Sequence, residues 1–242
     1  MIPLAAPPPL PSDVFGCRIE TLWRCYHRFP ELFTLYQTQG GGLLARLDDR
    51  LWQLGPADAD ELAAFAGWCG AGLIAGREAD LPRLPGWHGA VHAVLRCPSC
   101  DVAPLPPDDH ADLRIVYEIL SCDDDFAAQS SFLPWLSDLR RRMATGCAHV
   151  YLLDDAATAL VTAVGCHHAL ITSVATLPCH RRRGLATRLV GGACAHLLAR
   201  GLTPVVVAQN AQSIPFYQRL GFLPAGRQVM LFPSHRKESP HR

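Results

Sequence analysis

The sequence predicts an α/β fold in which a mixed sheet is flanked by helices on both faces. Two short β runs, His149–Leu153 and Ala157–Val164, are separated by the turn-forming pair Asp154 and Asp155, a pattern typical of a hairpin. A further strand is predicted at Ala169–Thr176. Helical and strand-like patterns then alternate over Gly184–Leu198, Pro204–Ala208, Ala211–Leu220 and Val229–Phe232. Hairpins predict antiparallel pairs and intervening helices predict parallel crossovers, so the sheet should be mixed.

The earlier part of the chain supplies fewer signals. Strands are predicted at Leu32–Gln37 and Gly42–Leu54, followed by a helix that begins near Asp58 or Asp60, because acidic residues suit the first turn of a helix. Leu113–Leu120 alternates like a strand, and Phe126–Met143 has helical periodicity.

A break in hydrophobic periodicity divides the chain. Residues 97–112 are rich in Pro, Asp and small side chains, as in a linker. We therefore expect a disordered leader at 1–12, an N-terminal α+β unit at 13–96, a second unit at 113–235 and a tail at 236–242.

Composition excludes several classes of protein. Of 242 residues, 49% are hydrophobic and 18% are charged, which is enough for a substantial core and excludes a disordered or fibrous chain. Apolar runs such as Val205–Ala208 are too short to span a bilayer, and no positively charged export segment opens the sequence. We expect a cytoplasmic protein with no membrane partner.

Cysteine spacing argues against a metal site. The ten cysteines are scattered, which favours reduced thiols. Cys97 and Cys100 form one CxxC pair, with His92 and His110 nearby, but no second CxxC follows. Two thiols in a linker are therefore favoured over zinc.

Charge is segregated between the two halves. Residues 1–125 contain 18 acidic and 9 basic residues, whereas residues 126–242 contain 4 and 13. A basic region of this kind should attract an anionic ligand. Nucleic acid is also anionic and would be attracted to the same region, but the basic residues are dispersed and no nucleic-acid-binding motif accompanies them.

The segment from Val174 to Thr187 joins a predicted strand to a predicted helix. Unpaired N–H groups and the dipole at a helix N-terminus bind phosphates well, and Gly184 and Ala186 would let phosphate oxygens approach the backbone. This segment resembles the acetyl-CoA loop of the GCN5-related N-acetyltransferase (GNAT) family, Arg/Gln-x-x-Gly-x-Gly/Ala, with Arg181, Gly184 and Ala186 at the defining positions.

A second segment supports the same resemblance. Asn210, Ser213, Phe216, Tyr217 and Gly221-Phe222 are similar to the later family signature, Asn-x-x-Ala/Ser-x-x-Phe-Tyr-x-x-x-Gly-Phe. Asn210 can cap a helix and Gly221 suits a C-cap. The two signatures occur in the order that the family requires.

The resemblance implies that 113–235 is a GNAT-like acyl-CoA-binding domain that moves an acetyl group from acetyl-CoA to a primary amine of a small molecule or peptide, by direct attack in a ternary complex. It implies Tyr217 as the proton donor to the departing thiolate, and backbone N–H groups of the preceding strand as partners for pantetheine and the thioester carbonyl. The implied cofactor-binding residues are Val174, Ala175, Thr176, Arg181, Arg182, Arg183, Gly184, Leu185, Ala186, Thr187, Asn210, Ser213 and Phe216.

No residue stands out as the general base. Asp154 and Asp155 are interpreted as turn formers. His167 and His168 have a suitable pKa range, and Glu118, the N-terminal unit or a water molecule are further candidates. The N-terminal unit carries neither signature, and is interpreted as a degenerate repeat of the same fold or as an acceptor-selecting lid.

Two other functions stay open at the level of the sequence. One is a non-catalytic, CoA-binding regulatory module, and the other is a basic nucleic-acid-binding domain. The sequence predicts neither the acceptor, nor the acyl chain length, nor the oligomeric state.

Overall fold

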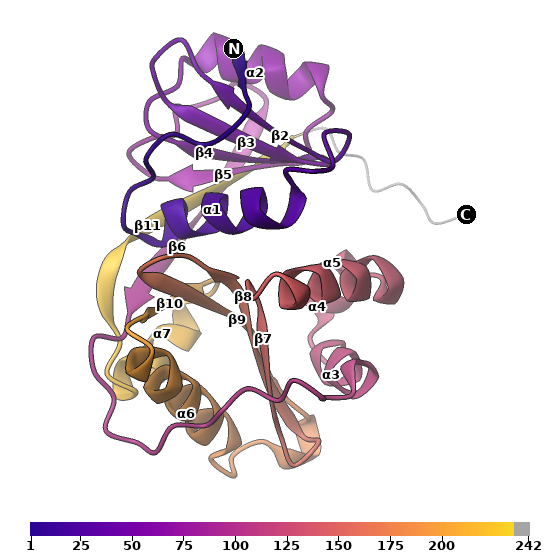
Figure 1. Cartoon of the computed structure of the whole chain (residues 1–242), viewed down its shortest axis with the longest axis vertical. Helices are drawn as coiled ribbons and strands as arrows, with labels where there is room; N and C mark the ends of the chain where they lie inside the picture. Colours follow the sequence, from indigo (N-terminus) through magenta and orange to yellow (C-terminus); the bar gives the residue numbers. More distant parts are fainter. Residues whose placement is uncertain (235–242) are drawn as a thin grey trace.

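A computed structural model describes residues 1–234, which form one eleven-stranded sheet with helices packed against it (Figure 1). The strands are β1 (Ile2–Leu4), β2 (Phe33–Gln37), β3 (Leu43–Leu47), β4 (Arg50–Leu54), β5 (Leu73–Arg77), β6 (Trp87–Arg96), β7 (His149–Leu153), β8 (Ala157–Val164), β9 (His168–Thr176), β10 (Thr203–Ala208) and β11 (Leu223–Pro233). The helices are α1 (Val14–Tyr26), α2 (Ala59–Trp68), α3 (Leu113–Leu120), α4 (Asp124–Gln129), α5 (Phe132–Ala144), α6 (Leu185–Ala199) and α7 (Ile214–Arg219), with 3₁₀ turns η1 (Pro178–His180) and η2 (Ala211–Ser213).

The two halves of the chain follow the same order of elements. After α1, strands β2, β3 and β4 form an antiparallel meander, and α2 crosses over so that β5 lies parallel to β4. After α3 to α5, strands β7, β8 and β9 form a second meander, and α6 crosses over to β10, which is parallel to β9. The predicted mixed α/β fold with flanking helices is confirmed, and the shared order agrees with the interpretation of the N-terminal unit as a repeat.

The halves exchange their last strands. The sheet order is β1-β2-β3-β4-β5-β11-β6-β10-β9-β8-β7. Strand β6 therefore lies between β10 and β11, and β11 lies between β6 and β5, with every one of these pairs antiparallel. The boundary expected at residue 96 falls at the end of β6, which completes the sheet of the C-terminal half. Each exchanged strand covers an edge that would otherwise present unpaired backbone groups.

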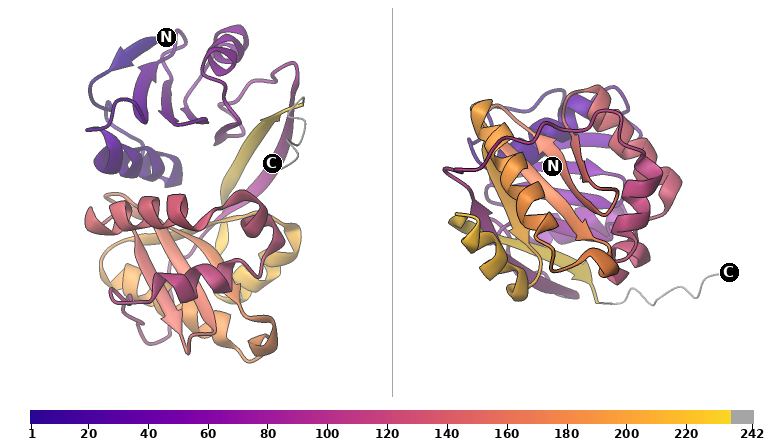
Figure 2. Two further views of the ribbon diagram at one scale, coloured as in Figure 1. Left: turned by 90° about the vertical axis from the view of Figure 1, so that its right-hand side faces the viewer. Right: turned by 90° about the horizontal axis from the view of Figure 1, so that it is seen from below.

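Helices cover both faces of the C-terminal part of the sheet (Figure 2). On one face, α6 buries Leu189, Val190 and Leu197 against the sheet. On the other face, α3 and α5 pack on β8. Helix α1 from the first half packs on β8 and β9 and contacts α5, and its Val14 shares a cluster with Val205. Fully burying one such aliphatic side chain stabilises a fold by about 1.5–3 kcal/mol, so α1 fixes the first half onto the second.

The N-terminal leader was wrongly predicted to be disordered. Residues 2–4 form β1, which pairs with the edge strand β2, and the amino group of Met1 lies 2.9 Å from a carboxylate oxygen of Glu61. The unpaired edge of β2 supplies the hydrogen-bonding partners that a sequence pattern does not reveal.

The elements before β7 also differ from the prediction. Leu113–Leu120 is helix α3, not a strand; Asp112 caps it, and the buried residues Val116, Ile119 and Leu120 follow helical spacing. The single helix predicted at Phe126–Met143 is two, α4 and α5, because Ser130 is extended. Helix α1 and strands β5 and β6 were not predicted.

The later elements agree with the prediction within a few residues. The hairpin of β7 and β8 has the predicted bounds, and Asp154 and Asp155 form its turn with φ of +54° and +48°. The final strand is longer than expected and begins at Leu223. The predicted tail at 236–242 lies outside the described residues.

Residues 97–112 contain no helix or strand, but they are fixed to the C-terminal half. Leu105 donates its backbone N–H to Gly192 on α6 at 2.9 Å, and Asp108 donates to Val150 on β7 at 2.8 Å. Within residues 1–234, no helix has the length and hydrophobicity to cross a membrane.

Candidate acyl-CoA site

An opening in the sheet lies between β9 and β10. The parallel ladder joins His168–Ile171 to Thr203–Val206, after which β9 continues to Thr176 and β10 to Ala208 without pairing with each other. Ser173 has a φ of +51° at the point of divergence, and β8 and β9 shift register nearby. The edge of β9 that faces β10 therefore has backbone groups free to pair with an extended ligand.

The predicted phosphate loop follows directly from β9. Gly184 is in the left-handed region (φ +76°) and precedes α6 without a side-chain cap. Leu185 is buried and anchors the helix, Ala186 is half-buried and Thr187 is exposed. The first-turn N–H groups have no side-chain cap and lie at the positive end of a 15-residue helix. These groups could hold an anion such as pyrophosphate.

The three arginines of the loop have different surroundings. All three side chains are exposed. Arg181 donates from Nε to the carbonyl oxygen of Thr176 at 3.1 Å, which ties the loop to the end of β9. Arg182 has a φ of +64°, and neither Arg182 nor Arg183 has a hydrogen bond or ion pair within the described part of the chain. They are free to meet an anion.

The second signature lies across the opening, after β10. The side-chain oxygen of Asn210 accepts from the N–H of Ser213 at 2.8 Å, and the Ser213 hydroxyl donates to the Asn210 carbonyl at 2.8 Å. The predicted cap is thus present, although the Ser213 hydroxyl is engaged within the turn. Gly221 (φ +85°) ends α7 as predicted, and Phe222 donates its N–H to Tyr217.

Tyr217 sits between two aromatic rings. Its ring centroid lies 5.1 Å from that of Phe216 and 5.4 Å from that of Phe222. Burial, and to a smaller extent the nearby Cys194, raises the pKa of Tyr217 to about 12. Its hydroxyl makes no hydrogen bond within residues 1–234. A protonated phenol with a free hydroxyl remains available to a ligand at neutral pH.

The two signatures converge on one core. Val174 and Leu185 from the first, and Phe216 and Tyr217 from the second, all pack on the cluster under α6. A cavity of about 290 Å³ adjoins this region and is lined by Val174, Ala175, Thr176 and Arg181 together with Ile119, Cys122 and Asp123. Asp123 was not predicted from the sequence, because only the packing of α3 brings it to β9.

None of the residues considered as the general base lines this cavity. Asp154 and Asp155 are turn residues, Glu118 and His167 are exposed and do not line this cavity, and His168 lies at the opposite end of β9. Cys97 and Cys100 donate their thiols to backbone carbonyls of Ser99 and Gly191, and the described residues contain no cluster of three metal-ligating side chains.

Comparison with known proteins agrees with this geometry. Residues 105–222 match the model of the acetyltransferase (GNAT) family. Residues 105–222 are a GNAT domain. No curated protein matches the sequence significantly.

Solved GNAT structures share the fold of the whole chain. A GCN5-related N-acetyltransferase from Kribbella flavida is 17% identical, with 91% of this chain and 94% of that chain covered and a TM-score of 0.62. A putative GNAT acetyltransferase from Novosphingobium aromaticivorans is 21% identical, with 88% and 97% covered and a TM-score of 0.53. A tandem GNAT protein from the clavulanic acid biosynthesis pathway is 11% identical, with 98% and 99% covered and a TM-score of 0.52. The likeness to a tandem protein agrees with the repeated order of elements described above.

Proposed function

We propose that the GNAT domain binds acetyl-CoA and transfers its acetyl group to a primary amine of a small molecule or peptide. The observation that carries this proposal is the opening between β9 and β10, which has the phosphate loop at one side and Tyr217 at the other.

The residues present fit acetyl-CoA along its length. The uncapped N–H groups of Leu185, Ala186 and Thr187 would hold the pyrophosphate, with charge from Arg181, Arg182 and Arg183. The free edge of β9, from Ser173 to Thr176, would pair with the amide groups of pantetheine. Asn210, Ser213 and Phe216 would border the arm from the side of β10.

The chemistry is direct transfer. The amine nitrogen attacks the thioester carbonyl carbon, the carbon–sulfur bond breaks, and the thiolate takes a proton from the Tyr217 hydroxyl. Backbone N–H groups at the bend near Ser173 would stabilise the developing oxyanion. The amine must lose a proton, and Asp123 is the carboxylate in the cavity beside β9. One of its oxygens accepts from the N–H of Phe126 at 3.0 Å, and its other oxygen would accept this proton directly or through water.

The first test is isothermal titration of the full chain with acetyl-CoA. It is run beside the triple variant Arg181→Gln, Arg182→Gln, Arg183→Gln and a control triple variant Arg28→Gln, Arg50→Gln, Arg83→Gln. The control removes the same charge from exposed positions in the first half of the chain. We expect the loop variant to bind about 10- to 100-fold more weakly, since charged hydrogen bonds contribute about 1.5–3 kcal/mol each. Equal affinity in all three proteins, or no binding by the wild type, would refute the cofactor site.

Transfer is then tested with a library of amines. Free CoA is quantified by chromatography, because the ten cysteines of the chain would react with a thiol reagent. Release that requires an amine supports an acyltransferase. Tight binding of acetyl-CoA without release by any amine favours a CoA-binding regulatory module.

A further inference from the structure

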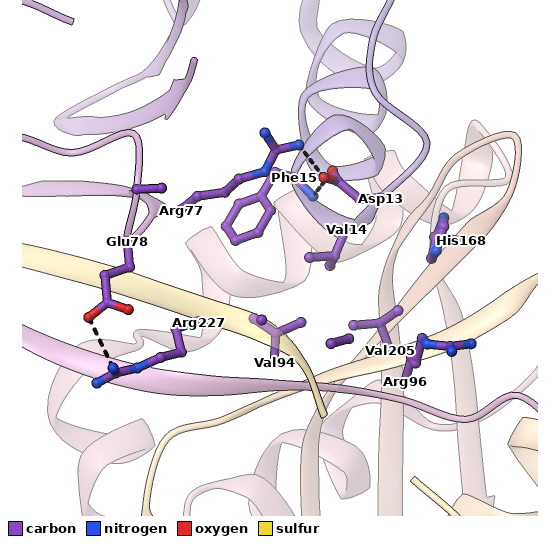
Figure 3. Close-up of a pocket in the computed structure, with 13 residues that line it drawn as sticks. Asp13, Val14, Phe15, Arg77, Glu78, Val94, Arg96, His168, Val205 and Arg227 are labelled. Carbon is purple, nitrogen blue, oxygen red and sulfur yellow. Dashed lines mark hydrogen bonds and ion pairs between the residues drawn. The ribbon is translucent and has the colours of Figure 1, made fainter. Parts of the chain in front are cut away.

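A second cavity, of about 390 Å³, lies where the two halves of the chain meet (Figure 3). It is bordered by the start of α1, the end of β5, and strands β6, β9, β10 and β11. None of the residues of the two GNAT signatures lines it. It is therefore separate from the path proposed for acetyl-CoA.

The floor of this cavity is apolar. Val14, Val94 and Val205 come from three different elements and pack in one cluster, with Phe15 at its edge. Figure 3 shows these side chains grouped between α1 and the sheet. The volume lies within the roughly 300–1,000 Å³ typical of small-molecule sites. Such a surface favours an apolar ligand body.

The rim of the cavity is cationic. Asp13 is bonded to Arg77, and Glu78 pairs with Arg227 at 3.2 Å, so both carboxylates of the lining are already neutralised. Arg96 also lines the cavity, on β6 directly opposite Val205. Its side chain is exposed and has no ion pair or hydrogen bond in the part of the chain that the structure describes. One positive charge is therefore left without a partner beside an apolar floor.

His168 also lines the cavity and adds no negative charge to it. His168 is half-buried at the start of β9, and burial lowers its pKa below the ordinary value. It is therefore mainly neutral near pH 7 and can donate or accept one hydrogen bond. A ligand facing Arg96 thus meets no unpaired carboxylate in the lining.

We propose that this cavity binds a small carboxylate with an apolar body, whose carboxylate pairs with Arg96 and whose body lies on Val14, Val94 and Val205. A guanidinium and a carboxylate match in charge and planar geometry. A neutral ligand would leave Arg96 unpaired, and a cation would be repelled. Because α1 and β5 belong to the first half and β9 and β10 to the second, the bound ligand holds both halves together.

The test uses the full chain without acetyl-CoA, so its result does not depend on acyl transfer. Phenylacetate and hexanoate are titrated by calorimetry beside their neutral amides, phenylacetamide and hexanamide. Thermal unfolding is followed in parallel, because a ligand of the native state raises the melting temperature. We expect both carboxylates to bind, and each amide to bind at least about 10-fold more weakly, the loss of roughly one charged pair.

Two variants and one control locate the site. Arg96→Gln should weaken binding of phenylacetate by about 10-fold or more. Ala225→Trp, at an exposed position of the lining, should abolish it by filling the cavity. Arg83→Gln removes an exposed arginine outside the lining and should bind like the wild type. The proposal is overturned if neither carboxylate binds, if the amides bind equally well, or if Arg96→Gln and Arg83→Gln behave alike.

Discussion

Gly184 allows the phosphate loop to be tested apart from general stability. Its φ is +76°, and a Cβ built on it would meet no atom within 4 Å. The substitution Gly184→Ala therefore has two effects: it places a side chain in left-handed backbone, and it puts a methyl group into the space that the phosphate would enter. Left-handed conformation costs a residue with a Cβ roughly 1–2 kcal/mol, which corresponds to a decrease of about 2–8 °C in the melting temperature of a chain of this size.

Gly201 provides the matched control at the opposite end of the same helix. Its φ is +74°, and a Cβ there also meets no atom within 4 Å. Gly201→Ala should lower the melting temperature by a similar amount. Only Gly184→Ala should weaken acetyl-CoA binding, by about 10- to 100-fold, because the methyl group obstructs at least one charge-assisted N–H bond to phosphate.

The two variants are compared by thermal unfolding and by titration with acetyl-CoA. If both variants bind acetyl-CoA as tightly as the wild type, the backbone at Gly184 does not hold the phosphates and the assignment of the loop is wrong. If both weaken binding equally, the effect reflects strain in α6 and not the ligand.

Three further predictions concern the donor, the packing and the histidines. Tyr217→Phe should lower kcat about 100-fold without changing the Kd for acetyl-CoA. Because burial raises the pKa of Tyr217 to about 12, the wild-type rate should show no alkaline decrease from this group below about pH 10. An unchanged kcat in the variant would exclude Tyr217 as the proton donor. In Gly192→Ala, the new Cβ would lie 2.5 Å from Cβ of Leu105. Overpacking costs about 1–3 kcal/mol and the higher helix propensity of Ala returns about 1 kcal/mol, so the substitution should destabilise the chain by up to about 2 kcal/mol. In contrast, Gly67→Ala, with no atom within 4 Å, should stabilise it by about 0.4–1 kcal/mol in the same denaturant titration; stabilisation by both would show that Leu105 does not pack on α6. Burial lowers the pKa of three histidines in the folded state, namely His149, His168 and His196. The unfolded chain therefore takes up protons first as the pH falls through about 6.5, and the free energy of unfolding should decrease between pH 7.5 and 5.5; a flat profile would contradict the shifts.

Much of the C-terminal half could be predicted from the sequence because its signals are local. The pair Asp154-Asp155 specifies a hairpin turn. Gly184 precedes α6 and Gly221 follows α7, and both have the positive φ that glycine adopts readily. Asn210 caps its turn through a contact three residues away. These features depend on neighbours along the chain, so their spacing carries the information.

Predictions failed where the partner is distant in sequence. Leu113–Leu120 alternates like a strand and folds as α3, because packing of Val116 and Leu120 against the sheet decides the outcome. The segment at 1–12 was expected to lack order, yet β1 pairs with residues more than thirty positions away.

The sequence by itself determined the class of fold, the GNAT signatures and the two sides of the proposed acyl-CoA site, since each depends on short-range chemistry. The tertiary structure decided the exchange of β6 and β11, the placement of α1 on the second half, and with them Asp123 beside β9 and the Arg96 cavity between the halves. Those arrangements depend on pairing between strands that are far apart in the sequence and on burial of side chains from both halves against each other. The surfaces that these residues contact exist only once the chain has folded.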